Sequence, residues 1–503
     1  MPARGSRDWE VGLVRGAIAS LFLYLLARTW ADPDLWGHLR FGRDIVAAGS
    51  VHVADPYTFT GLGTWVNPSW LADVLMYGAW AWGGTAGLVA AKVVVAAAIV
   101  LVAAATLHRR GVRGPALDLL SLCGLAAVYP SVLTVRPQLF ALLLFALLVH
   151  VQAAEASRWR LRLVATPVLL AVWANFHGSW VLGLAEVLLW SAGELIARDR
   201  TGRERVQLAA TALLAALATV ATPYGTALWW RLSGAMTPVL QDVSEWRSLP
   251  ETSWALVVVW GLLVAMGAAA ALGRRLRASE VLVLGWLAWS SWRVSRLVQF
   301  FGLATLGFAG APLLAGRAQR ARPEAGAART PLATRVLVVV CGAVVIAGSV
   351  AATLRSMRCL HMDYSRQADV CAARFIALNR LDGRLLAYSD WGLYAVWHFA
   401  PALRVSLDGR REFAYPAAEL ARHATVYWNE PGALAAVDAL APDYVWLPRG
   451  LPVVPALRSS AEWRVIFETD RSVVLARASA AGRPWRQPRA CELPPCFPAD
   501  PVS

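Results

Sequence analysis

Long apolar runs, separated by short gaps that carry arginines, occupy most of the first 354 residues of this 503-residue chain. A run of about 17–25 apolar residues can cross the hydrocarbon core of a bilayer as a helix, and tilting of the helix or thinning of the bilayer accommodates other lengths. Eleven runs fit this pattern, at roughly 11–30, 84–107, 115–131, 137–154, 161–175, 179–196, 207–222, 254–272, 280–292, 296–315 and 335–354. The sequence therefore predicts an α-helical polytopic membrane protein with about eleven transmembrane helices.

The composition agrees with a membrane protein, because 57% of the residues are hydrophobic and 16% are charged, proportions that soluble domains rarely have. The net charge of +15 would also suit a nucleic-acid-binding protein. The arginines, however, lie in the gaps between apolar runs, where the positive-inside rule places them. We therefore expect the lipid bilayer as a partner and no nucleic acid.

The distribution of arginines also predicts an orientation. With the N-terminus in the cytoplasm, the cytoplasmic gaps hold most of them, at 109–113, 158–162, 198–205, 274–277 and 317–335. The outer loops hold fewer, namely Arg40, Arg43, Arg136, Arg231, Arg247, Arg293 and Arg296. No small-residue cleavage site follows the first run, so it is predicted to be a retained helix. We expect a multi-pass inner-membrane protein whose C-terminal domain lies outside the cytoplasm.

The first outer loop, about 31–83, opens with Ala31-Asp-Pro-Asp-Leu-Trp-Gly-His-Leu-Arg-Phe-Gly-Arg43. Pro33 disfavours helical angles at Asp32, which places the carboxylates of Asp32 and Asp34 at a helix mouth near the membrane surface. Two such carboxylates can ligate a divalent cation, or one can act as general base on an acceptor hydroxyl. A solvated helix cap with a charged loop is the simpler alternative. Later in the same loop, Ser69–Trp82 is predicted to form an amphipathic helix at the interface.

Further polar groups are expected on the same outer face. His177 lies in the short gap Asn175-Phe-His-Gly-Ser179, either as part of a site or as a cap on a helix connection. Arg293 and Arg296 either anchor lipid headgroups or hold the phosphate of a lipid-linked donor. The outer loop at about 222–253 adds Asp242 and Glu245.

The pattern changes after about 355 to that of a water-soluble α/β domain of roughly 150 residues. Its predicted strands are Arg384–Tyr388, Leu403–Leu407, Tyr444–Leu447, Trp463–Glu468 and Ser472–Arg477. We predict three parts: a transmembrane domain at 1–354, an extracytoplasmic α/β domain at 355–482, and an irregular Pro-rich tail at 483–503. In an oxidising compartment, Cys491 is predicted to pair with Cys496, and Cys359 with Cys371.

Two segments carry a family resemblance. Asp34-Leu-Trp-Gly-His38-Leu-Arg40, followed by Asp55-Pro-Tyr-Thr-Phe-Thr60, resembles the first outer loop of GT-C-fold glycosyltransferases, and among them the catalytic subunit of oligosaccharyltransferases and related bacterial membrane proteins. Tyr388-Ser-Asp390-Trp-Gly392-Leu-Tyr394, with Leu407-Asp408-Gly-Arg410 downstream, resembles the Trp-Trp-Asp-Tyr-Gly region that opens their soluble domain. The order of the parts is the same as in those enzymes.

The resemblance implies an inverting transferase that moves a sugar from a polyprenyl-phosphate-linked donor to an extracytoplasmic glycan, lipid or protein. Asp34 matches the catalytic or metal-binding aspartate of the first loop, and Asp32 is the second choice. Glu245 lies in a later outer loop where a further acidic residue is expected, so Mg or Mn is a possible cofactor held by these three carboxylates. The implied substrate-binding residues are His38, Arg40, His177, Arg293, Arg296, Asp390, Trp391, Gly392, Asp408 and Arg410.

The sequence also departs from the oligosaccharyltransferase pattern. The outer gap at Ser131–Arg136 lacks the second acidic motif, and Tyr388-Ser replaces the Trp pair that binds acceptor peptide. These departures favour transfer of a monosaccharide to an unknown acceptor over transfer to asparagine, and they leave the metal dependence open. A transporter or flippase is the first alternative, although the spans hold few acidic residues. A non-catalytic protein of envelope-polysaccharide assembly is the second.

Overall fold

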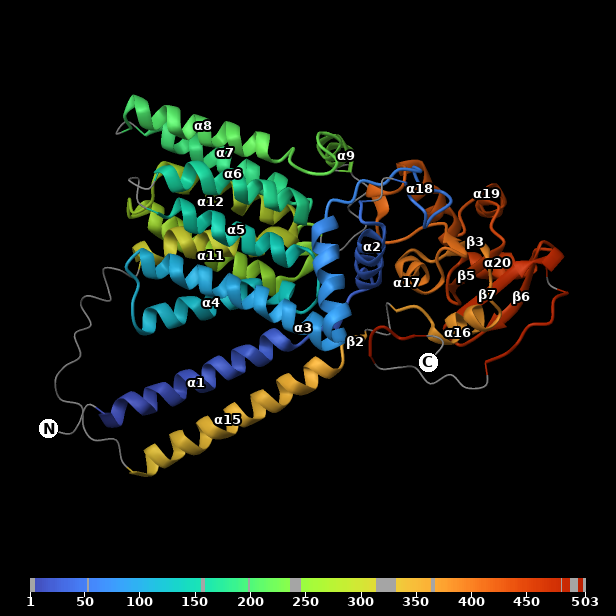
Figure 1. Cartoon of the computed structure of the whole chain (residues 1–503), viewed down its shortest axis with the longest axis horizontal. Coiled ribbons are helices and arrows are strands. Elements are labelled where there is room, and N and C mark those ends of the chain that lie inside the picture. Colours follow the sequence, from blue (N-terminus) through green and yellow to red (C-terminus); the bar gives the residue numbers. More distant parts are fainter. Residues whose placement is uncertain are drawn as a thin grey trace. The chain divides into compact units, whose positions relative to one another are not determined.

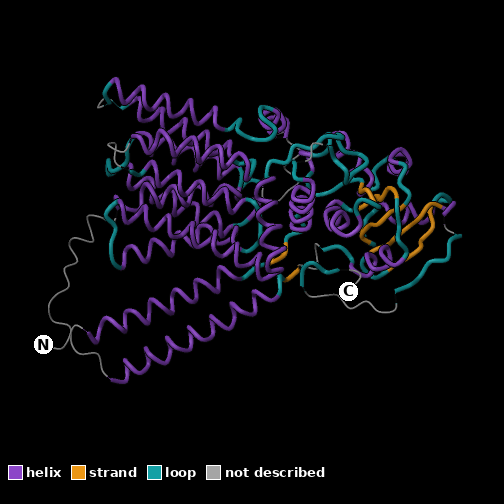
Figure 2. The backbone as a smooth tube through the Cα atoms, viewed as in Figure 1, coloured by secondary structure: helices purple, strands orange, loops and turns teal. Residues whose placement is uncertain are grey.

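The computed structural model describes residues 5–51, 54–154, 159–197, 200–235, 246–313, 332–362, 367–480, 482–488 and 496–500. Contacts within the chain divide it into two compact units (Figures 1 and 2). The first, called the helical unit, comprises Met1–Thr29, Thr85–Thr222 and Leu240–Arg358. The second, called the mixed unit, comprises Trp30–Gly84, Pro223–Val239 and Cys359–Ser503. The first outer loop thus belongs to the same compact unit as the C-terminal α/β part.

The helical unit has a helix at each of the eleven predicted apolar runs. These are α1 (Gly5–Ala27), the part of α3 (Trp70–Arg109) that follows Gly84, α4 (Pro115–Val132), α5 (Gln138–Gln152), α6 (Trp159–Phe176), α7 (Trp180–Ile196), α8 (Gly202–Ala218), α11 (Trp254–Leu272), α12 (Ala278–Arg293), α13 (Val298–Thr305) with the π-helix η5 (Leu306–Gly310), and α15 (Leu332–Arg358). Two short elements, α10 (Leu249–Thr252) and η4 (Ser295–Leu297), accompany them.

Four helices of the described chain are long and apolar enough to cross a membrane, judged by length and composition: Trp70–Arg109, Trp254–Leu272, Ser295–Leu313 and Arg335–Arg358. The helical character of the predicted runs is therefore confirmed, whereas the number of crossings stays a prediction. The helix α3 is interrupted by non-helical angles at Gly83 and Gly84, which is where the predicted interfacial helix gives way to the predicted span.

Helices α1 and α15 run side by side in the same direction (Figure 1). A Cβ on Gly342 would lie 2.9 Å from Leu13, and one on Gly16 would lie 3.8 Å from Ile346. The residue numbers rise together along the two helices, so the helices are parallel. Glycine at 342 lets the two backbones approach, as small residues do in membrane bundles.

One buried cation in the helical unit escaped the sequence analysis. Lys92 of α3 is 2% exposed, and its Nζ donates to Arg28 O at 2.8 Å, Thr29 Oγ1 at 2.7 Å and Val132 O at 2.6 Å. Those acceptors stand at the C-terminal ends of α1 and α4, where carbonyls lack partners within the helix. Lys92 therefore acts as a shared cap on the two helix ends.

The mixed unit is built on a five-stranded sheet of order β4-β3-β5-β7-β6. The strands are β3 (Gly383–Ala387), β4 (Leu403–Val405), β5 (Tyr444–Pro448), β6 (Trp463–Glu468) and β7 (Ser472–Arg477), which confirms all five predicted strands. β3 is parallel to β4 and β5, whereas β7 is antiparallel to β5 and β6. The helices are α2 (Leu35–Ala48), the first part of α3, α9 (Ala227–Ala235), α16 (Val370–Leu378), α17 (Ser389–Phe399), α18 (Ala417–Tyr427), α19 (Ala433–Leu440) and α20 (Val453–Ser459), with 3-10 turns η6 (Arg411–Phe413) and η7 (Ala478–Ala480).

The first outer loop completes this unit. Two residues of that loop extend the sheet beyond its edge strand β4: Phe59 N–H donates to Val405 O, and Val405 N–H donates to Tyr57 O at 3.0 Å. Covering an edge strand removes its unpaired backbone groups from solvent. A separate parallel pair, β1 (Trp30–Ala31) with β2 (His361–Met362), ties the start of the loop to the start of the C-terminal part.

The cysteine pairing differs from both predicted pairs. Cys359 forms a disulfide with Cys496, 137 residues away along the chain, so the predicted pairs Cys491–Cys496 and Cys359–Cys371 are wrong. Cys371 is also disulfide-bonded. The observed pair forms because the segment 496–500 returns to β2, where Phe497 N–H donates to Leu360 O at 3.0 Å. The spacing of the cysteines along the sequence does not reveal this pairing.

Two residues of the predicted irregular tail, Phe497 and Ala499, are buried in the core of the mixed unit. Phe497 is 2% exposed, and its ring centroid lies 4.9 Å from that of Trp36 and 5.3 Å from that of Trp80. Trp36 Nε1 donates to Pro498 O at 3.0 Å, and Tyr394 Oη donates to Ala499 O at 2.8 Å.

Candidate functional site

Asp34 stands at the N-cap position of α2, but its side chain makes no capping hydrogen bond. The neighbouring carboxylate shapes the turn instead: Asp32 Oδ1 accepts from the Asp34 N–H at 3.0 Å, and Asp32 O accepts from Leu35 N–H at 3.0 Å. Asp32 is buried, whereas Asp34 is half-buried. The Asp34 carboxylate lies against Gly409, since a Cβ on that glycine would collide with Asp34 Oδ1. The Asp34 side chain therefore does not cap α2, whereas the Asp32 side chain binds a backbone N–H at the start of that helix.

One helical turn beyond Asp34, His38 belongs to a chain of hydrogen bonds. Its Nδ1 donates to Asp73 Oδ1 at 2.7 Å, and Asp73 Oδ2 accepts from Asn67 Nδ2 at 2.7 Å. The Asp73 side chain is fully buried, and that of His38 is 19% exposed. The sequence analysis missed Asp73 and Asn67; the one available signal was a carboxylate in the first turn of the amphipathic helix.

These contacts shift the titration of His38. Burial, the largest effect, lowers its pKa, but the charge and hydrogen bond of Asp73, with the charges of Asp34 and Asp32, outweigh burial and leave the pKa raised. Because the folded pKa lies above that of the unfolded chain, the imidazolium stabilises the fold fully below about pH 6.5, and this stabilisation is lost as the pH rises through the folded pKa.

We therefore expect His38→Gln to lower the unfolding midpoint more at pH 5.5 than at pH 8.5, measured on the full chain in lipid nanodiscs. His361→Gln is the matched control, because His361 is exposed in the same unit. An equal loss at both pH values would show that the imidazolium does not contribute through its charge.

Arg40 is buried and committed to packing. Its Nε donates to Asp44 Oδ2 at 2.7 Å, and its Nη1 donates to the carbonyls of Val396 at 3.2 Å and Ala400 at 3.0 Å. These carbonyls end α17, where a positive charge is favoured by the helix dipole. The contacts favour a structural role over the predicted substrate-binding one.

Arg410 is also buried, between two carboxylates and three rings. Its guanidinium is bidentate to Asp408, with Nη2–Oδ2 at 2.7 Å and Nε–Oδ1 at 3.0 Å, and its Nη1 lies 3.1 Å from Asp55 Oδ1. The rings are those of Phe41, Tyr57 and Trp65, whose centroids lie 5.3, 5.3 and 4.7 Å from Cζ. The predicted substrate-binding pair Asp408 and Arg410 thus joins the two motif-bearing segments from inside the protein.

The segment Ser-Asp-Trp-Gly forms the first turn of α17. Asp390 is exposed there, whereas Trp391 is 5% exposed and packs 5.3 Å from the ring of Trp446. Gly392 permits close approach, since a Cβ there would lie 2.7 Å from Asp408 Cα. On the facing helix α2, a Cβ on Gly37 would lie 2.7 Å from Leu393. The two stretches that carry the family resemblance are therefore packed against each other.

The remaining candidate residues belong to the helical unit. His177 Nδ1 accepts from Ser179 N–H at 3.0 Å and lies 2.7 Å from Ser179 Oγ, so the side chain closes the turn between α6 and α7. Arg296 Nη2 donates to Gln138 Oε1 at 3.1 Å, and its Cζ lies 5.0 Å from the ring centroid of Trp246. Arg293 is exposed at the end of α12.

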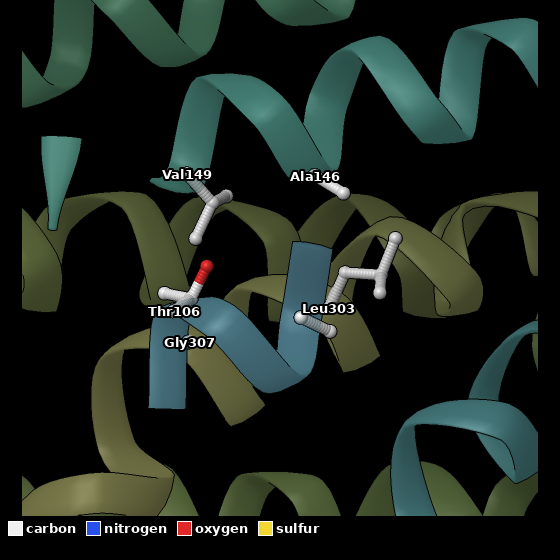
Figure 3. A pocket seen from close by; sticks show the side chains of 6 residues that line it. Thr106, Ala146, Val149, Leu303 and Gly307 are labelled. Atoms are coloured by element: carbon white, nitrogen blue, oxygen red, sulfur yellow. The ribbon is translucent and has the colours of Figure 1, made fainter. Parts of the chain in front are cut away.

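A metal site is not assembled within the part of the chain that the structure describes: no three His, Cys, Asp or Glu side chains gather there as a ligand set. Asp32 and Asp34 supply two carboxylates, and the predicted third ligand, Glu245, lies outside the described residues together with Asp242. The small cavity lined by Thr106, Ala146, Val149, Leu303 and Gly307 offers no substrate site (Figure 3). At about 10 Å³ it has room for at most one water molecule.

No protein-family model and no curated protein matches the sequence. Solved structures do match. ArnT from Cupriavidus metallidurans, bound to undecaprenyl phosphate, is similar over 95% of this chain and 99% of its own, at 17% identity and a TM-score of 0.54. The apo oligosaccharyltransferase of Archaeoglobus fulgidus is similar over 88% of this chain and 69% of its own, at 12% identity and a TM-score of 0.55. The archaeal AglB in complex with an inhibitory peptide and a dolichol-phosphate gives 10% identity, 89% and 70% coverage, and a TM-score of 0.54.

Proposed function

We propose, from the premise that this chain has the GT-C fold of membrane glycosyltransferases, that it transfers a sugar from a polyprenyl-phosphate-linked donor to an acceptor outside the cytoplasm. The observation that carries the proposal is the half-buried Asp34 carboxylate, which lies beside His38 and against the turn of the α/β part at Gly409. The lipid phosphates in the names of two similar structures support the class of donor.

The chemistry asks little of the protein beyond charge and position. The acceptor oxygen attacks the anomeric carbon as the bond between that carbon and the phosphate oxygen breaks, and the polyprenyl phosphate leaves with the electron pair. Asp34 takes the acceptor proton, since a hydroxyl is a poor nucleophile at neutral pH. The leaving phosphate needs a positive partner, which His38 supplies when protonated. In the helical unit, Arg293 and Arg296 are proposed to bind the phosphate of the lipid carrier. A bound Mg or Mn, if Asp32 and Asp34 hold one, would add Lewis-acid stabilisation of that phosphate.

The orientation follows the arginine bias, with the N-terminus in the cytoplasm and the mixed unit outside. The parallel course of α1 and α15 supports an odd number of crossings but does not bear on the orientation, because the first and last of an odd number of spans run in the same direction. Eleven crossings meet that condition.

Binding of the lipid carrier tests the donor class. We expect undecaprenyl phosphate to raise the unfolding midpoint of the full chain in nanodiscs, and uncharged undecaprenol not to. With Gln at both Arg293 and Arg296, we expect the same shift to require at least ten times more undecaprenyl phosphate, since one charge-assisted bond is worth about 1.5–3 kcal/mol. Arg355→Gln, at the exposed end of α15, serves as control. Equal stabilisation by both lipids would mean that the phosphate is not recognised.

A transporter or flippase would also bind the carrier, and a non-catalytic assembly protein need not transfer sugar. Sugar transfer that depends on Asp34 separates the enzyme from both alternatives.

A further inference from the structure

The turn Asp408-Gly-Arg410 contacts Asp34. No residue of this turn has a role in the proposed chemistry. A Cβ on Gly409 would lie well within 3.0 Å of Asp34 Oδ1 and 2.9 Å from Leu393 Cδ1. Real Cβ atoms essentially never come so near to another heavy atom. Gly409 does not adopt the left-handed conformation that favours glycine, so the requirement is one of space. Gly409 is exposed, and the contact is therefore at the surface of the mixed unit, where a substrate can reach.

Contacts on both sides fix the position of the turn. On one side, Arg410 binds Asp55 of the first loop and lies among its aromatic rings. On the other, the Asp408 backbone lies against Gly392, where even a methyl group would not fit. Packed interiors transmit such constraints because they compress little. A side chain added at 409 must therefore displace the Asp34 carboxylate together with the end of the Leu393 side chain.

We propose that the 408–410 turn is the wall that sets the position of the Asp34 carboxylate, with Gly409 as the positioning residue that keeps the space open. This inference rests on the proposed function. It gives the α/β part a share in the chemical step, since a base must stand within hydrogen-bond reach of the proton that it takes.

A stability cycle tests the contact without any activity. We expect Gly409→Ala to lower the unfolding midpoint of the full chain by a few degrees, and this loss to be largely removed when Asp34→Ala is present. Gly450→Ala is the matched control, because Gly450 is exposed in the same unit with nothing within 4 Å of its Cβ position. No loss with Gly409→Ala, or the same loss in both backgrounds, overturns the inference.

A kinetic measurement tests the consequence. We expect Gly409→Ala to lower kcat about 10²-fold with the KM for the lipid donor unchanged, because a misplacement of about 1 Å costs this much. Gly450→Ala should leave both constants unchanged, and Gly409→Ala should add nothing to Asp34→Asn. A rise in KM at constant kcat overturns the positioning role. If the wild-type chain transfers no sugar, the proposed function fails, and the stability cycle still decides whether the turn sets the carboxylate.

Discussion

Asp34→Asn is expected to lower the rate of sugar transfer by about 10²–10⁴-fold while leaving the unfolding midpoint within about one degree of wild type, since general base catalysis is worth that factor. Asparagine keeps the shape of the side chain and its fit against Gly409, but it can neither take the acceptor proton nor ligate a cation as a carboxylate does. The fold should tolerate the change, because the Asp34 side chain makes no capping bond to α2.

The measurement is transfer by purified variants in lipid, with thermal unfolding recorded in parallel. Asp382→Asn is the control, an exposed carboxylate in the same unit. Asp32→Asn is expected to be less damaging and to lower stability, because Asp32 Oδ1 holds the turn through the Asp34 N–H. Full turnover by Asp34→Asn would remove this residue from the mechanism, and full turnover by the double variant would remove the opening stretch of the first loop.

The helices and strands were predictable because their signals are local. Apolar runs and alternating strands depend on nearby residues only. Helices are found at the eleven apolar runs and strands at the five predicted positions, whereas the number of membrane crossings stays a prediction. The signals that failed are those that depend on where distant segments meet. The pairing of Cys359 with Cys496 is one, since it requires the tail to return to β2.

The candidate site shows the same division. The stretch around Asp34 was found from its charge and its place after the first apolar run. Asp73 is not predicted as a site residue from the sequence, because its partner His38 lies 35 residues away and neither residue belongs to a recognisable motif with the other. The family resemblance implies that Arg40 and Arg410 bind substrate. Their burial against α17 and against Asp408 cannot be seen in the sequence. Motif residues thus include some that build the unit.

Arg410→Met is expected to destabilise the mixed unit by about 3–5 kcal/mol, because removing one partner of a buried ion pair leaves the other charge uncompensated. The methionine keeps an apolar stem among the rings of the first loop, so the loss comes from the guanidinium and its bonds to the carboxylates. The substitution leaves two buried carboxylates without the Arg410 counter-charge: Asp408 and Asp55, whose side chains are 0% and 2% exposed. Arg404→Met is the control, since Arg404 is exposed on the neighbouring strand β4.

The readout is denaturant unfolding of the full chain together with sugar transfer under conditions where the variant is still folded. A role in joining the first loop to the α/β part predicts that transfer falls only as the folded fraction falls, and that adding Asp55→Asn to Arg410→Met recovers part of the stability, because one of the two stranded charges is then neutral. A folded Arg410→Met protein of wild-type stability that no longer transfers sugar would contradict this role and return Arg410 to the substrate.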